Sequence, residues 1–188
     1  MNADFQQLTT TLYDLDTLKN EILAAEKKHS FLRKTVIGWE SIPIRSVDGL
    51  EGDEGNMGGG KNNSANPGDY MYTSVADCCP YLKSILESFG APILKVRILK
   101  LIKGRKIGQH IDQFGSEAII RFHIPVVSHP KVKVFVEKES RYLEPGYLYW
   151  LNVRKNHRVE NNSTVDRIHI VFDLYRNENV DKLFNAKK

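Results

Sequence analysis

The sequence contains only two cysteines, Cys78 and Cys79, and they are adjacent. Neighbouring cysteines cannot close a disulfide-bonded loop, and they lack the C-x-x-C spacing of a metal-binding pair. This usage predicts reduced, packed thiols in a cytoplasmic protein. A secreted fold held together by disulfides is therefore not expected.

Long apolar runs are also missing, and no segment approaches the length of about 20 residues that spans a bilayer. The first residues lack a basic region followed by an apolar core, so we expect no secretory signal. The chain also has no large excess of charge of one sign. Its net charge is +4 over 188 residues, and the charged residues are interspersed. Because a nucleic-acid partner favours a basic stripe with interleaved aromatic residues, we expect neither a nucleic-acid nor a membrane partner.

The chain does contain enough apolar sequence, 41% of its residues, to bury one core without disulfides. Leucine and isoleucine recur at helical spacing over 14–30, which predicts a helix. Residues 31–44 carry the β-branched and aromatic residues of one or two strands. The polar, glycine-rich stretch 45–69 predicts a flexible loop, either disordered or closing over a ligand. A second helix is predicted over 80–89, because Pro80 suits a first turn and a glycine follows the end.

After residue 92 the pattern changes to short strands separated by turn residues. The predicted strands are 93–102, 106–112, 117–125, 132–137, 146–152 and 166–175. Short strands at this spacing are typical of jelly-roll and cupin-like barrels. We therefore predict one domain of mainly β class. Its double-stranded β-helix core covers 93–176, helices of a support region over 1–92 pack on one sheet, and 177–188 form a tail or short helix.

Two of the predicted strands have one apolar face and one face that carries polar residues. In 118–124, Arg121 and His123 share the face opposite the apolar residues, and in 167–174 Arg167 and His169 do the same. We interpret this as one apolar sheet face covered by helices and one polar face toward a cavity. The alternative is that the polar faces meet water, as in many half-buried antiparallel sheets.

His110 and Asp112 are two residues apart in a predicted strand, so their side chains point to the same face. A second histidine brought back by folding would give two nitrogens and one oxygen on one side of an ion. This arrangement suits non-heme Fe(II) and leaves other positions open. We predict His157 as the third ligand, with a turn histidine bonded only to backbone as the alternative. The competing candidates are His123, His129 and His169.

Arg167 follows His157 by ten residues. A planar guanidinium binds a carboxylate through two parallel hydrogen bonds, so we predict that Arg167 clamps a carboxylate of a co-substrate at the metal. His123 and His169 each lie two residues from an arginine, which suggests a shared anion site. Salt bridges to acids are the alternative role for Arg121 and Arg167.

Several motifs occur in a fixed order: Arg97-Ile-Leu, His110-Ile-Asp112, Arg121-Phe-His123-Ile-Pro125, Gly146 through Asn152, His157-Arg-Val-Glu-Asn161 and Arg167-Ile-His169. Each piece is weak alone, but the ordered set is specific. Over about Arg97 to Asp173 the chain resembles the aspartyl/asparaginyl β-hydroxylase family of Fe(II)/2-oxoglutarate dioxygenases, which also includes small hydroxylases of free amino acids such as proline.

The resemblance implies an enzyme that uses Fe(II), 2-oxoglutarate and O₂ to hydroxylate an unactivated C–H bond of an amino acid. That amino acid is free, within a peptide or on a carrier, and succinate and CO₂ are released. The implied metal ligands are His110, Asp112 and His157, and the implied co-substrate contacts are Arg167, Arg121 and His123. Because the acidic ligand is present, a halogenase, which needs a small residue there, is not expected.

The substrate contacts are predicted from two further polar residues. Arg97 stands on an early strand where some family members have a serine, and we interpret it as a contact to the substrate carboxylate, with a core ion pair as the alternative. Asn152 precedes His157 on a strand face and is predicted to line the pocket near the metal or to hydrogen-bond a ligand. A hypothesis from another class is a non-catalytic cupin-like module that binds a metal or a small acid.

Overall fold

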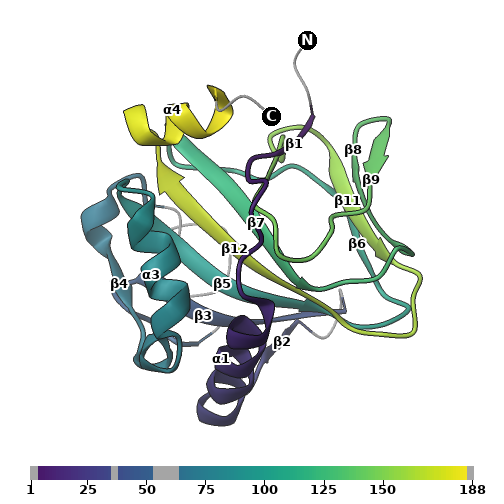
Figure 1. Cartoon of the computed structure of the whole chain (residues 1–188), viewed down its shortest axis with the longest axis horizontal. Helices are drawn as coiled ribbons and strands as arrows, with labels where there is room; N and C mark the ends of the chain where they lie inside the picture. The colour runs from purple at the N-terminus through teal and green to yellow at the C-terminus, as the bar shows by residue number, and fades with distance from the viewer. Residues whose placement is uncertain (1–3, 35–37, 53–63, 186–188) are drawn as a thin grey trace.

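Two antiparallel sheets face each other across a cavity that residues of both sheets line (Figure 1). The computed structural model describes residues 4–34, 38–52 and 64–185. The large sheet has the strand order β1 (Phe5–Gln7), β10 (Tyr149–Leu151), β7 (Ile119–Val127), β12 (Arg167–Tyr175), β5 (Ile93–Leu101), β3 (Trp39–Val47) and β2 (Leu32–Lys34), and β4 (Tyr70–Tyr72) pairs with β3. The small sheet has the order β6 (Lys106–His110), β11 (His157–Asn161), β8 (Val132–Val136) and β9 (Glu139–Arg141).

The helices are α1 (Leu15–Lys28), α3 (Pro80–Ser88) and α4 (Glu178–Asn185), with short 3₁₀ turns at Pro67–Asp69 and Ser74–Cys78. None of the helices in the described ranges is long and apolar enough to cross a bilayer. The Asp14 side chain caps α1 by accepting hydrogen bonds from the backbone N–H groups of Asp16 and Thr17. The predicted helix over 14–30 is therefore confirmed, with its first residue serving as the cap.

A buried carboxylate couples α1 to α3. Glu21 of α1 accepts hydrogen bonds from the backbone N–H groups of Tyr81 and Leu82, at 2.6 and 3.0 Å. These N–H groups belong to the first turn of α3, where they have no partner within the helix. The negative charge also complements the positive end of the α3 dipole. Glu21 of α1 thus acts as the N-terminal cap of α3.

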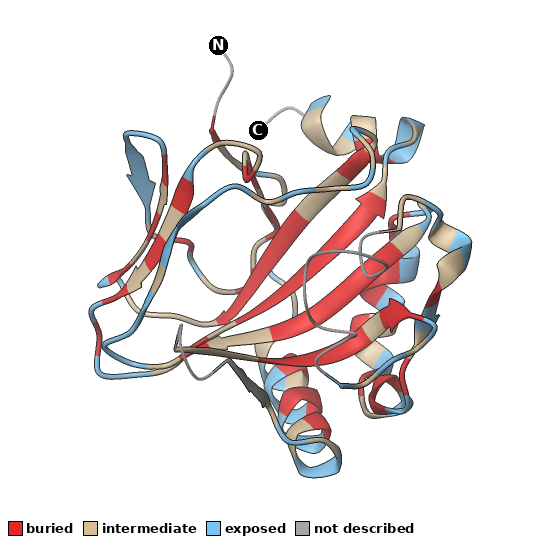
Figure 2. Cartoon of the chain, turned by 180° about the vertical axis from the view of Figure 1, so that it is seen from behind, coloured by how far each residue is buried: buried red, intermediate tan, exposed pale blue. Residues whose placement is uncertain are grey.

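The large sheet has one apolar and one polar face, as the alternation predicts. Phe122 and Ile124 of β7 and Ile170 and Phe172 of β12 are fully buried in one core with residues of α1 and α3. The rings of Phe122 and Phe172 stack at a centroid distance of 5.6 Å, and Phe89 packs against both. Figure 2 shows the long strands of this sheet buried over most of their length. The other face carries the arginines and histidines described below.

The strand predictions after residue 92 are confirmed within a few residues, except that the segment 146–152 is a strand only over β10. Four short strands were not predicted: β1, β4, β9 and β11.

The predicted loop 45–69 starts too early, because β3 continues to Val47 and pairs with β4. Residues 53–63 of that loop lie outside the described residues. The C-terminal segment forms the short helix α4. The division at 92/93 stays a prediction, and β3 pairs with β5 across it.

The stacked phenylalanines give a direct test of this core. We expect Phe172→Ala to lower the free energy of unfolding by about 3–5 kcal/mol, because it removes a buried ring and leaves a cavity. Leu23→Ala is the control, since this side chain is 54% exposed and its loss should cost at most about 0.5 kcal/mol. Urea unfolding of the metal-free proteins measures both. Equal effects from the two variants would contradict the assigned core.

Candidate metal centre and neighbouring anion site

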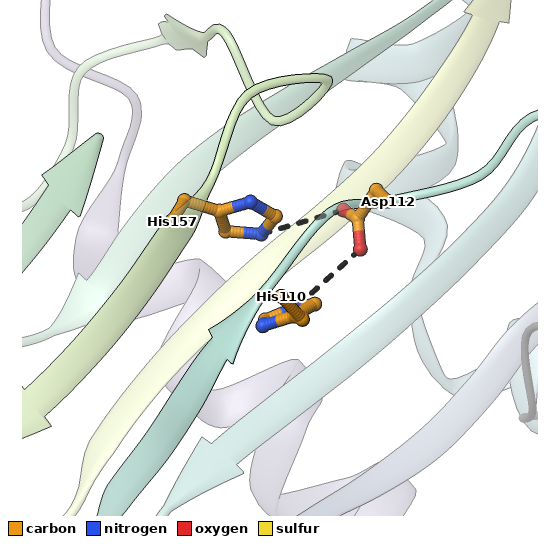
Figure 3. A group of neighbouring side chains, drawn as sticks. All are labelled: His110, Asp112 and His157. Atoms are coloured by element: carbon orange, nitrogen blue, oxygen red, sulfur yellow. Dashed lines mark ion pairs between the residues drawn. The ribbon is translucent and has the colours of Figure 1, made fainter. Parts of the chain in front are cut away.

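The three residues predicted as metal ligands lie together at one edge of the cavity. Strands β6 and β11 pair so that His110 and His157 are direct cross-strand neighbours, with ring centroids 4.1 Å apart. Asp112 follows His110 by two residues, and its backbone N–H bonds to the carbonyl of Val153 at 2.9 Å. One ligand atom from each of the three residues lies within 4.8 Å of the others. Figure 3 shows both imidazoles turned toward the Asp112 carboxylate.

The hydrogen bonds of the two imidazoles fix which nitrogen faces the centre. Nδ1 of His110 donates to the carbonyl of Gly108 at 2.8 Å, and Nδ1 of His157 donates to the carbonyl of Lys155 at 3.0 Å. Both Nε2 atoms therefore face Asp112, at 3.4 Å from Oδ1 for His110 and 3.8 Å from Oδ2 for His157. Ligands at right angles around a first-row divalent ion are about 3 Å apart, so small adjustments would bring these atoms to coordination distance.

The electrostatics of the cluster suit a cation. Burial acts to raise the pKa of Asp112, but the adjacent Arg121 charge and the His110 hydrogen bond outweigh it and hold the pKa well below its usual range. The hydrogen bond to Asp112 raises the pKa of His110, whereas burial lowers that of His157. An ionised carboxylate beside two imidazoles with inward Nε2 atoms is a donor set that fits Fe(II).

Arg121 forms the salt bridges that the sequence left open as an alternative. Its Nη1 donates to Asp112 at 2.6 Å, and its Nε and Nη2 donate to the two oxygens of Asp173, both at 2.7 Å. Asp173 is a residue that the prediction did not include. Its alternation with Arg167 and His169 was visible in the sequence, but its pairing with Arg121 depends on the register between β7 and β12.

Arg167 has a different environment from Arg121. Its side chain is buried, with the residue 3% exposed, and its Nη2 lies 2.7 Å from Nδ1 of His169. No carboxylate of the described residues forms a salt bridge with it, and its Nε has no hydrogen-bond partner. Burial lowers the pKa of Arg167 to about 9. A buried guanidinium without an acid is costly unless an anion binds there.

Two buried imidazoles lie beside Arg167. His123 and His169 are 8% and 1% exposed, and their ring centroids are 6.3 Å apart. Burial, reinforced by the charge of Arg167, holds the pKa of both well below the usual value, so both rings are neutral. Both ring nitrogens of His123 and the Nε2 atom of His169 lack a hydrogen-bond partner among the described residues. Buried polar atoms without a protein partner are free to bind water or a small polar molecule.

One cavity of about 120 Å³ is lined both by the three predicted metal ligands and by Arg167 and His123. The polar side chains that line it are Arg97, His110, Asp112, Arg121, His123, His157 and Arg167. Asn152 is not among the lining residues, because its side-chain amide points to Asp4, with Nδ2 donating to Oδ1 at 3.4 Å. The cavity therefore does not support the predicted pocket contact of Asn152. It does include Arg97, which was predicted to contact the substrate.

A family model described as aspartyl/asparaginyl beta-hydroxylase matches residues 3–177, almost the whole chain. The chain belongs to the aspartyl/asparaginyl β-hydroxylase family. It is therefore a 2-oxoglutarate- and Fe(II)-dependent oxygenase, and family membership favours this enzyme over the non-catalytic binding module. No curated protein matches the chain.

Solved structures of low sequence identity share the fold. A 2-oxoglutarate–Fe(II) oxygenase from Burkholderia pseudomallei is 13% identical, with a TM-score of 0.59 over 94% of this chain and 86% of that one. A prolyl-4-hydroxylase from Pseudomonas putida is 15% identical, with a TM-score of 0.54 over 94% of each chain. A prolyl hydroxylase from Trichoplax adhaerens, in complex with a hypoxia inducible factor peptide fragment, is 12% identical, with a TM-score of 0.57 over 100% and 89%. These matches confirm the predicted jelly-roll class.

The two neutral imidazoles predict how stability depends on pH. Because the folded protein keeps both uncharged, the unfolded chain binds more protons below about pH 6.5, and the free energy of unfolding falls as the pH drops. Each histidine contributes about 1.4 kcal/mol per pH unit in that range. Unfolding of the protein with a chelator present, between about pH 6.5 and 5, should give a steeper slope than for the double variant His123→Gln/His169→Gln. Parallel curves would mean that the folded protein protonates these rings.

Proposed function

We propose that the chain is an Fe(II)- and 2-oxoglutarate-dependent dioxygenase that hydroxylates an unactivated C–H bond of an amino acid, free or within a peptide or carrier-bound residue, with release of succinate and CO₂. The observation that carries the proposal is Arg167: a buried guanidinium without an acidic partner among the described residues, in the same cavity as the His110, Asp112 and His157 cluster.

His110, Asp112 and His157 would hold Fe(II) on one side of the ion, through two Nε2 atoms and a carboxylate oxygen. The backbone carbonyls that accept from both Nδ1 atoms keep each ring in the tautomer that a metal ligand needs. Fe(II), when bound, couples the oxidative decarboxylation of 2-oxoglutarate by O₂ to C–H hydroxylation, chemistry that side chains alone do not supply. The protein's own part is to orient the reactants and exclude water.

Arg167 would bind the distal carboxylate of 2-oxoglutarate, with His123 as a further contact. The guanidinium offers an unpartnered Nε in a buried site, where a bidentate bond to a carboxylate is strong. A neutral His123 ring has one N–H to donate and one nitrogen to accept. Arg121 lines the same cavity, but three of its N–H groups already bond to Asp112 and Asp173. Its proposed contribution to co-substrate binding is therefore its charge.

The cavity has a buried end and an open end, which gives the proposed direction of substrate approach. Arg167 is 3% exposed, whereas the His110 side chain is 41% exposed and Ile111 is 51% exposed. The substrate would therefore reach the metal from the side of His110, and Arg97 of the cavity lining would bind its carboxylate. The peptide bound to the Trichoplax adhaerens prolyl hydroxylase supports a small or peptidyl substrate.

Arg167 gives the first test of the proposed co-substrate site. Arg167→Ala should raise the KM for 2-oxoglutarate about 10- to 150-fold, because a charge-assisted hydrogen bond contributes about 1.5–3 kcal/mol. Arg167→Lys should recover part of the loss, since it keeps the charge without the planar fork. Succinate production as a function of 2-oxoglutarate concentration measures both. An unchanged KM in Arg167→Ala would remove the basis of the proposal.

The metal ligands give a second test, on turnover itself. Iron-loaded protein incubated with 2-oxoglutarate and candidate amino acids or peptides should release succinate and add one oxygen, about 16 Da, to one of them. His110→Ala and Asp112→Ala should abolish both signals, because two remaining ligands hold Fe(II) weakly. His29→Ala is the matched control, since the His29 imidazole follows the end of α1, where its Nδ1 bonds to the adjacent Ser30 carbonyl, and it does not line the cavity. Activity that survives in His110→Ala would exclude the proposed ligand set.

A further inference from the structure

Arg121 stands at the centre of a line of three charged side chains that ends at the metal cluster. One end of its guanidinium donates to Oδ2 of Asp112 at 2.6 Å, and the other makes a bidentate bond to Asp173. The side chains of Arg121 and Asp173 are only 11% and 8% exposed. Short, charge-assisted, bidentate bonds away from water fix the plane of a guanidinium.

The fold holds this guanidinium in place by two further means. Arg121 of β7 is the direct cross-strand neighbour of Asp173 of β12, so the sheet itself brings the bidentate pair together. Phe114, two residues after Asp112, lies against the same guanidinium, with Cζ of Arg121 4.9 Å from the ring centroid. Cζ of Arg154 lies 4.6 Å from that centroid. Arg121 therefore has little freedom to turn away from Asp112.

We propose that Arg121, supported by Asp173, is a positioning residue that keeps Asp112 a one-oxygen ligand of the metal; this inference rests on the proposed function. The bond to Arg121 engages Oδ2 and leaves Oδ1 for the ion. A carboxylate that bound through both oxygens would occupy one more coordination position, and in a facial arrangement the open positions are needed for co-substrate and O₂.

Asp173 offsets the repulsion between the Arg121 guanidinium and a metal ion that Asp112 would bind. A guanidinium next to the metal ligand repels the ion, and this repulsion is large away from water. Asp173 places a second negative charge on the far side of Arg121, so the three side chains together carry a net charge of −1. The pair of acids thereby lets Arg121 orient Asp112 without cancelling the negative charge that attracts the metal.

Two affinities separate positioning from a direct contact of Arg121 with 2-oxoglutarate. The first is the Kd for Mn(II), a redox-stable probe, measured by calorimetry without 2-oxoglutarate. The second is the Kd for 2-oxoglutarate at saturating Mn(II). A positioning role predicts that Arg121→Gln raises the Mn(II) Kd about 10- to 100-fold, the range for residues that orient metal ligands, with a smaller change for 2-oxoglutarate. Arg121→Lys should recover part of the Mn(II) affinity. Normal Mn(II) affinity with weakened 2-oxoglutarate binding would overturn the proposal.

Asp173→Asn is the second variant, because it keeps the shape of the side chain and touches neither Asp112 nor the metal. It should weaken Mn(II) binding in the same direction, and it carries the test should Arg121→Gln not fold, as judged by circular dichroism and unfolding with chelator. Arg154→Gln is the matched control. It removes the other guanidinium from Phe114, the salt bridge to Glu117 and the hydrogen bonds that Arg154 donates to the carbonyls of Ser116 and Ile119. None of these partners is a predicted metal ligand, so the Mn(II) Kd should stay within about twofold. An equal loss in Arg154→Gln would assign the effect to loop packing instead and overturn the proposal.

His110→Ala distinguishes failure of this inference from failure of the proposed function. Loss of Mn(II) binding in His110→Ala together with normal binding in Arg121→Gln would leave the metal site standing and remove only the positioning role. Unchanged Mn(II) binding in His110→Ala would remove the proposed metal site itself, and the positioning role with it.

Discussion

The pairing of β6 with β11 is the constraint on which the site depends. It makes His110 and His157 cross-strand neighbours although 46 residues separate them in the chain. Asp112 follows two residues after His110, and its backbone N–H bonds to the Val153 carbonyl. Side chains alternate along a strand, so a slip of one residue would turn His157 to the opposite face of the small sheet. The register is held on the other side as well, because β11 pairs over its whole length with β8.

The large sheet performs two tasks with the same strands. One face of β7 and β12 is buried under α1 and α3, and the opposite face presents charged and imidazole groups to the cavity. The two cavity arginines differ in a way that separates structure from binding. Arg121 forms salt bridges with two carboxylates within the protein, whereas Arg167 has none among the described residues. Free energy given up by leaving Arg167 unpaired is recovered only when an anion binds.

The sequence was sufficient for the fold class, for most of the strands and for the set of residues that meet in the cavity, because these follow from local alternation and from motif order. It was insufficient where long-range register decides. The strand β11 was missed because its five residues are mostly polar and turn residues flank them, so only pairing with β6 and β8 identifies it. The contact of Asn152 with Asp4 depends on the pairing of β1 with β10, which no local pattern announces. Arg121 illustrates the same limit. The sequence suggests an acid as an alternative partner, but it does not identify that acid as Asp112 or Asp173.

The carboxylate of Glu21 has a consequence for how small the enzyme can be made. A truncated version starting after α1 would leave the Tyr81 and Leu82 N–H groups without their acceptor, and it would remove Leu18, Ile22 and Ala25 from the core that α1 shares with α3. Strand β3, which follows α1, would have to be kept as well, because it pairs with the strand β5 that carries Arg97. A minimal catalytic fragment therefore has to retain the first helix, although none of its residues lines the cavity.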